Sequence, residues 1–377
     1  MARSSRLIKG FIVLLLVVIA IRLALPYAAQ WYINRTLSQP GDYHGKVGDV
    51  DLMLWRGAYS LEQIILVQDG GSVERPLFKA DKVEFSLLWS ALIRGRGVGD
   101  VTLTRPEINF IDAANDQQDQ TGESENWLNL ANQLFPLRID KLAIIEGQIA
   151  FYNPDAAPPI DVALHAINGE AYNLVNSRDL SKDLVARAKF VAQTAEQGTL
   201  SVQSQLNPST KNPTFDIDVQ ANDVALVNFK NLLDTYAPFD LEAGTLELAA
   251  EIASDDGYVQ GYVKPILHNV EVFSWKGDIE RDNDGFFKGV VEATSAFIAE
   301  LFENQSQDQI ATRIPIEGQL DNPQTPVLPA LGAIVKNAFI EALQGSVEES
   351  VDLNDATKSR EAANKSREAA NDEVEKQ

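Results

Sequence analysis

The chain has 377 residues, of which 54 are acidic and 32 are basic, so its formal net charge is −22 at pH 7. This charge repels the phosphates of nucleic acid and argues against a DNA- or RNA-binding protein. The absence of cysteine excludes disulfides, thiolate nucleophiles, Cys-ligated zinc sites and iron–sulfur clusters. Hydrophobic residues make up 45% of the chain, which is enough for one extended domain or two compact ones.

An apolar segment, residues 10–33, is predicted to be a transmembrane helix. Arg22 is its only charged residue. At about 1.5 Å per residue, the segment is long enough to cross a hydrocarbon core of about 30 Å. The side chains expected to anchor it are Phe11, Leu14, Leu15, Leu16, Ile19, Ile21, Leu23 and Leu25. Trp31 and Tyr32 follow at the position of an interfacial aromatic belt.

Basic residues within residues 1–9 set the expected orientation of this helix. The positive-inside rule places residues 1–9 in the cytoplasm and everything after about Tyr32 on the far side of the membrane. A cleaved signal peptide is the alternative interpretation. Pro26 and Tyr27 argue against it, because they interrupt the small residues that a cleavage site requires.

Beyond residue 45, apolar and polar residues alternate with a period of two in many short runs. In the clearest run, Phe215, Ile217 and Val219 alternate with Asp216 and Asp218. Strands with one apolar and one polar face are typical of antiparallel sheets, whereas buried parallel strands are continuously apolar. The predicted fold class is therefore mainly β, with a long curved antiparallel sheet and a few short helices after the transmembrane helix.

The apolar members of these runs are the candidate lining of one hydrophobic side of the sheet. They are Val83, Phe85, Leu87, Ile149, Phe151, Val162, Leu164, Phe215, Ile217, Val219, Leu246, Leu248, Ile252, Ile314 and Ile316. Such a side can pack as a dry core or stay open as a hydrophobic groove. Alternation alone does not separate the two outcomes.

Other segments break the alternation. Short helices are expected over 86–94, 127–134, 286–304 and 329–344. The polar segment 112–126 is expected to be a solvated loop, and 346–377 is expected to be a flexible charged tail that contains the heptad KSREAAN twice. The last two helices are placed to cover an open end of the sheet.

Catalytic and metal-binding patterns are missing from the sequence. His44, His165 and His268 each lack a second ligand at metal-site spacing, and neither a G-x-S-x-G elbow nor a phosphate-binding loop occurs. The chain is therefore expected to be no enzyme and to bind no cofactor or metal.

Two weaker patterns do not indicate binding sites. Gly95, Gly97 and Gly99 follow an expected helix and precede a strand, which is the wrong order for a dinucleotide site, so a turn is expected there. Asp112, Asp116 and Asp119 miss the spacing of a calcium loop.

The order of several motifs resembles the AsmA-like superfamily of Gram-negative envelope proteins, in its branch of periplasmic proteins with a domain of unknown function. The motifs are VEFSLLWSALIRG at 83–95, VTLTRPEINF at 101–110, IDKLAIIEGQIAF at 139–151 and IPIEGQLDNP at 314–323. With the N-terminal anchor included, the resemblance extends over most of residues 1–345. The heptad tail has no counterpart in the resemblance.

This resemblance implies an inner-membrane anchor and a periplasmic β-rich domain over 34–345, with an apolar, β-taco-like groove. It implies phospholipid or another acyl lipid as ligand and a role in lipid handling or outer-membrane biogenesis. A dozen strands at about 4.8 Å make a groove of roughly 60 Å, so a short module or one that needs a partner is expected. The alternative is a non-enzymatic tether or assembly factor that binds envelope proteins.

Overall fold

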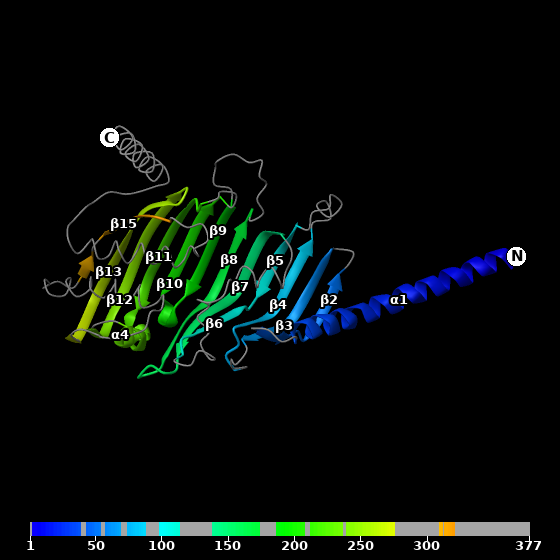
Figure 1. Ribbon diagram of the computed structural model, residues 1–377, viewed down its shortest axis with the longest axis horizontal. Coiled ribbons are helices and arrows are strands. Elements are labelled where there is room, and N and C mark those ends of the chain that lie inside the picture. Colours follow the sequence, from blue (N-terminus) through cyan, green and yellow to red (C-terminus); the bar gives the residue numbers. More distant parts are fainter. Residues whose placement is uncertain are drawn as a thin grey trace, which may run out of the picture. The chain divides into compact units, whose positions relative to one another are not determined.

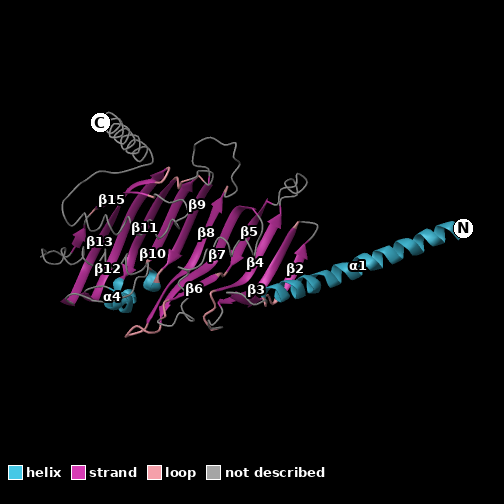
Figure 2. Ribbon diagram, viewed as in Figure 1, coloured by secondary structure: helices cyan, strands magenta, loops and turns pink. Residues whose placement is uncertain are grey.

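A computed structural model describes the fold of most of the chain. The described residues are 2–38, 43–53, 57–68, 74–87, 98–113, 138–173, 186–207, 212–236, 239–275, 309–311 and 313–320. Their strands form one 15-stranded sheet in the order β1-β3-β4-β5-β7-β8-β9-β10-β11-β12-β13-β14, with β2 on β3, β6 on β4 and β7, and β15 on β13. Strands dominate the described chain (Figure 2), and the prediction of a mainly β fold with a long, largely antiparallel sheet is confirmed.

The described helices are α1 (Ala2–Leu37), the 3-10 turns Ala195–Gln197 and Leu226–Phe229, and α4 (Lys230–Tyr236). The strands of the N-terminal half are β1 (Tyr43–Lys46), β2 (Asp49–Met53), β3 (Ala58–Gln68), β4 (Phe78–Leu87), β5 (Val98–Thr104), β6 (Glu107–Ile111) and β7 (Arg138–Asn153). The remaining strands are β8 (Ile160–Tyr172), β9 (Ala186–Gln193), β10 (Thr199–Leu206), β11 (Phe215–Ala225), β12 (Phe239–Asp255), β13 (Tyr258–Trp275), β14 (Gln309–Ala311) and β15 (Ile314–Gln319). Figure 1 labels most of these elements.

The described residues fall into two compact units, one that runs to Ile149 and one that begins at Ala150. In the first unit, β3, β4 and β5 pair antiparallel, but β5 and β7 pair parallel, with Val101 beside Leu142. A parallel pair needs a long crossover connection. The segment between Thr104 and Arg138 provides this connection. Alternation along a single strand cannot reveal that its partner is parallel.

The core of the first unit is centred on aromatic and branched side chains of β3, β4 and β5. Val83 and Phe85 are completely buried. The Phe85 ring stacks on the Tyr59 ring, with centroids 4.6 Å apart, because the two residues are direct partners across β3 and β4. Leu61 and Val101 complete the same cluster. Stacked aromatic pairs of this kind add about 0.5–1.5 kcal/mol beyond the area that they bury.

In the second unit, each described strand from β8 to β13 pairs antiparallel with the next, and β15 pairs antiparallel with β13. The register shifts between Ala221 and Val224 of β11. Asp223 lies in that interval with a φ of 53°, which is consistent with a β-bulge. α4 and the turn before it contact β12, and α4 also contacts β8.

One predicted helix is wrong where it begins. Ser86 and Leu87, the first residues of the expected helix 86–94, are the last residues of β4. Ser86 pairs with Ala58 and Asp100, so hydrogen bonding to both neighbouring strands overrides the local helical preference. Residues 88–94 lie outside the described residues.

Several other predictions also fall outside the described residues. They are the helices over 127–134, 286–304 and 329–344, the loop 112–126 beyond Ala113, and the tail 346–377. Conversely, α4 was not predicted, although Phe229, Leu232 and Leu233 stand at helical spacing.

Candidate functional site

By length and composition, α1 is long and apolar enough to cross a membrane from Phe11 to Leu37, a stretch of 27 residues. The predicted anchoring side chains are exposed along it, from 36% for Leu25 to 67% for Phe11. Exposed apolar surface of this extent on a helix is unfavourable in water and fits a lipid environment. The extent of the apolar helix therefore agrees with the predicted span.

The last three turns of α1 pack on the first unit. Ala29, Ile33 and Leu37, spaced four residues apart, pack against its core cluster. Beside them, the Asn34 side chain makes two hydrogen bonds to one residue. Its Nδ2 donates to the Val47 carbonyl oxygen over 3.0 Å, and its Oδ1 accepts from the Val47 N–H over 2.7 Å.

Gln30 strengthens this attachment by donating from Nε2 to the Gly48 carbonyl oxygen. The opposite side of the helix stays uncovered, since Tyr27, Trp31 and Tyr32 are all more than half exposed. The Arg35 guanidinium lies 5.3 Å from the centre of the Trp31 ring. Helix α1 thus presents one side to the sheet and an aromatic, cationic side to its surroundings, an arrangement typical of a membrane interface.

In the second unit, the register of the strands collects the predicted lining residues on one side of the sheet. Val219 of β11, for example, is paired with Val202 of β10 and Ala250 of β12. Directly paired residues project from the same side of a sheet, so the register defines a surface that we call the apolar face. Its larger members are Phe190, Leu200, Val202, Leu206, Phe215, Ile217, Val219, Leu246, Leu248, Ile252, Val263, Leu267, Ile314 and Ile316.

Burial varies over the larger side chains of the apolar face. Phe215, near the start of β11, is 6% exposed, and Ile314 on β15 is 0% exposed. Elsewhere on the face, the larger side chains from β9 to β13 form a partly buried strip, about 19 Å over four strand spacings, which we call the trough. The trough is lined by Phe190, Leu200, Val202, Ile217, Val219, Leu248, Ile252 and Val263, all of them only partly buried.

Polar contacts hold the strand ends together at both margins of the trough. At one margin, Asn231 of α4 donates from Nδ2 to the Pro159 carbonyl oxygen over 2.9 Å, just before β8 begins. At the other, the Asp256 N–H donates to the Thr214 hydroxyl over 3.1 Å, which joins the β12–β13 turn to the segment before β11. Figure 1 shows α4 at one end of these strands.

The other predicted lining residues have different surroundings. Val162 and Leu164 are partly buried on β8, and they alternate with His165, whose partner Gln193 is on the polar side. Ile149 is 38% exposed, whereas Phe151 is buried. Val83 and Phe85 belong to the closed core of the first unit, Leu87 lies at the end of β4 and its side chain is outside the described residues, and Ile316 is buried beside Ile314.

The histidines lie on three different strands. His44 lies on β1 opposite Val67, and His165 is exposed on β8. The His268 Nε2 lies 3.4 Å from the Glu247 Oε1. Within the described part of the chain, no group of three or more His, Cys, Asp or Glu residues is placed to hold a metal ion.

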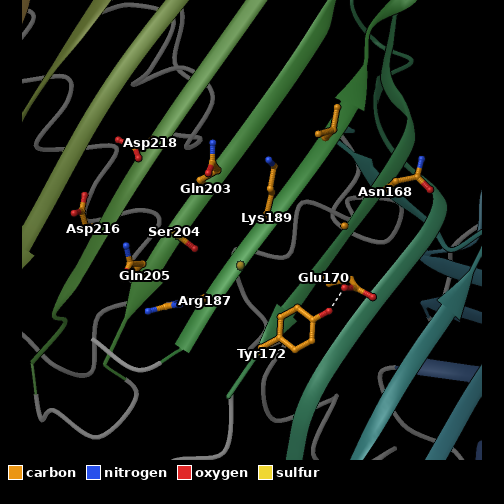
Figure 3. Close-up of a pocket in the computed structure, with 13 residues that line it drawn as sticks. Asn168, Glu170, Tyr172, Arg187, Lys189, Gln203, Ser204, Gln205, Asp216 and Asp218 are labelled. Carbon is orange, nitrogen blue, oxygen red and sulfur yellow. Dashed lines mark hydrogen bonds between the residues drawn. The ribbon is translucent and has the colours of Figure 1, made fainter. Parts of the chain in front are cut away.

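A polar hollow on the other side of the sheet had no signal in the sequence. It has a volume of about 820 Å³ and lies over β8, β9, β10 and β11. Its polar lining includes Glu170, Arg187, Lys189, Asp216 and Asp218. Figure 3 shows their side chains rising from neighbouring strands. In the sequence these residues are only the polar positions of separate strands. The register that brings them together depends on pairing between distant segments.

Comparisons with known proteins give no match. A scan against protein-family models matches no family, and a search of curated proteins finds none that matches. The resemblance to the AsmA-like superfamily therefore rests on the order of the motifs alone. The candidate site consists of the apolar face and of the end of α1 that packs on the first unit.

Proposed function

We propose that this protein is an inner-membrane-anchored, periplasmic lipid-handling module of the AsmA-like type, and that the trough accepts acyl chains. The observation that carries the proposal is the incomplete burial of the trough residues. A second layer of protein in full contact with the sheet would bury Val202 and Val219, which lie on central strands, as completely as Ile314.

The chemistry of the trough supports a hydrocarbon ligand. Its lining residues carry no charge, and Ser204, beside Ile217, is a rare polar residue on this part of the face. Each methylene group that leaves water for apolar surface contributes about 0.8 kcal/mol. An acyl chain would therefore bind in the trough, while a charged headgroup would lose hydration there without gaining a partner.

The docked anchor supports the same proposal. The contacts of Asn34 and Gln30 attach the first unit directly to the helix that would cross the membrane. The exposed aromatic side of α1 would lie at the level of the lipid headgroups. Such an arrangement would tether the chain that carries the trough to a membrane.

Native mass spectrometry of the full chain, released from detergent in the gas phase, tests the proposal. Wild-type protein is expected to retain phospholipid or fatty acid. Val219→Lys should lower the retained lipid at least about tenfold, because it places an unpaired ammonium group against the acyl chain. Gln220→Lys is the matched control, since Gln220 is the next residue on β11 and lies exposed on the polar side. Lipid-free wild-type protein, or equal losses in the two variants, would refute acyl binding in the trough.

A non-enzymatic tether or assembly factor is the second candidate function, and the docked helix favours it too. A rigid attachment between anchor and sheet would hold a partner at a fixed place on the membrane. Under this alternative, Val219→Lys would keep its cellular function and its crosslinks to envelope proteins. Under the lipid-handling proposal, the same variant would lose function while the crosslinks persist.

A further inference from the structure

We propose that a hollow on the C-terminal end of α1 binds the headgroup of an anionic phospholipid, with the lipid phosphate held by Arg35. This end of α1 lies beside β2 (Figure 1). The hollow, which we call the interfacial hollow, has a volume of about 390 Å³ and is lined by Tyr27, Gln30, Trp31, Asn34, Arg35 and Ser38. The inference rests on the proposed membrane anchor, but it does not depend on acyl binding in the trough.

The first argument is the position of the interfacial hollow along the helix. Trp31 and Tyr32 are 61% and 66% exposed, and exposed aromatic side chains of a membrane-spanning helix lie at the level of the lipid headgroups. At 1.5 Å per residue, Arg35 lies about 6 Å beyond Trp31 along the axis, and Tyr27 lies about 6 Å before it. The hollow therefore extends outward from the upper part of the acyl chains, and its cation lies at the level of the phosphates.

The second argument is that the N–H groups of Arg35 are available to a ligand. Its guanidinium lies 5.3 Å from the centre of the Trp31 ring, and it forms no hydrogen bond or ion pair with any residue that the structure describes. The helix end does not use it either. The Asn34 carbonyl oxygen accepts from the Ser38 N–H over 3.0 Å and from the Ser38 hydroxyl over 2.6 Å. The Trp31 ring thus orients a planar set of donors that matches a phosphate group.

The third argument is the chemistry of the lining, which selects a headgroup with a net negative charge. Arg35 is the only charged residue of the six. The ammonium group of a zwitterionic headgroup would find no carboxylate there, and the Trp31 ring is already beside Arg35. The Gln30 and Asn34 side chains are bound to the backbone of Val47 and Gly48. Phosphatidylglycerol therefore fits this hollow better than phosphatidylethanolamine does.

Native mass spectrometry tests the inference on the full chain, ejected from nanodiscs that contain equal amounts of phosphatidylglycerol and phosphatidylethanolamine. Wild-type protein is expected to retain at least about threefold more phosphatidylglycerol. Arg35→Gln should bring the ratio close to one, whereas Arg35→Lys should keep most of the preference because it keeps the charge. Arg187→Gln is the matched control, since Arg187 is an exposed arginine of β9. The same effects are expected in the Val219→Lys background, which separates the interfacial hollow from the trough.

Two results would overturn the inference. One is an equal retention of both lipids by wild-type protein. The other is an unchanged ratio in Arg35→Gln, as expected if the cation only stabilises the last turn of the helix.

Two further measurements identify the cause of a failure and the source of the phosphate. Wild-type protein that floats with vesicles in alkaline carbonate, yet retains both lipids equally, refutes the interfacial hollow and leaves the anchor standing. Protein that does not float refutes the anchor, and the inference fails with it. Loss of bound phosphatidylglycerol on addition of sn-glycerol 3-phosphate would assign the site to a free phosphate monoester and overturn the assignment to a lipid. Persistence of the bound lipid supports the lipid headgroup.

Discussion

Replacing Asn34 by alanine should loosen the attachment of α1 to the sheet. Asn34 satisfies both backbone groups of Val47, whose side chain is buried in the core of the first unit. Alanine keeps the helix, because it is the best helix former, but it can neither donate to nor accept from Val47. The expected consequence is local opening at the junction of helix and sheet rather than loss of the β fold.

The magnitude follows from the two hydrogen bonds. A typical bond contributes about 0.5–1.5 kcal/mol net, and leaving a buried partner unsatisfied costs about 1–3 kcal/mol. Gln30 still donates to the Gly48 carbonyl oxygen, so part of the attachment survives. A local cost of about 1–3 kcal/mol corresponds to roughly 5- to 150-fold faster exchange of the Val47 amide hydrogen, at about 1.4 kcal/mol per factor of ten.

Hydrogen exchange at single-residue resolution, on the full chain in detergent micelles, measures this effect. The Gly48 amide is an internal control, since it donates to the Glu62 carbonyl oxygen over 2.9 Å and not to α1. Thr36→Ala is the control variant, because the Thr36 hydroxyl donates only back to Tyr32 within the helix. Unchanged protection of Val47 in Asn34→Ala would show that the two side-chain bonds do not hold the helix in place.

Three further predictions concern stability. Phe85→Ala should lower the free energy of unfolding of the β body by about 3–5 kcal/mol in a denaturant titration, because it removes a fully buried ring, whereas Phe85→Leu should lower it less. Gly261→Ala should destabilise the β12–β13 pairing by about 1–3 kcal/mol, since the added Cβ would collide with the Glu251 carbonyl oxygen; a thermal midpoint equal to the wild type would contradict this. Burial raises the pKa of Tyr59 to about 12. An unfolded tyrosine ionises near pH 10, so the stabilisation from burying neutral Tyr59 is complete below about pH 10 and lost as the pH rises from about 10 to about 12. Denaturation midpoints across that range should fall for the wild type more than for Tyr59→Phe.

Alternation was the most informative signal in the sequence. It placed Phe215, Ile217 and Val219 on one side of a strand, and the structure shows those three residues on the apolar face. The apolar helix was equally accessible, because its length and its near absence of charge match what a bilayer core requires of a single helix. These features are local, and a period or a run of residues is enough to detect them.

The other features of the fold and of the candidate site depend on contacts between segments that are distant in the sequence. The alternation of β5 does not reveal its parallel pairing with β7, because an antiparallel partner would require the same pattern. Val83 and Val219 look alike in the sequence, yet one lies in a closed core and the other in a partly open trough. The charged residues that line the polar hollow come together through the register of β9, β10 and β11, which no single strand specifies.

The direction of the trough determines how such a surface can change in size. Because the trough crosses its strands, strand number sets its length and strand length sets its width. One added hairpin would extend it by about 10 Å without altering its cross-section. A deletion within a strand would narrow it instead. Insertion or loss of hairpins would therefore change the length of the trough to suit ligands of different length. The chemistry of each strand would stay the same.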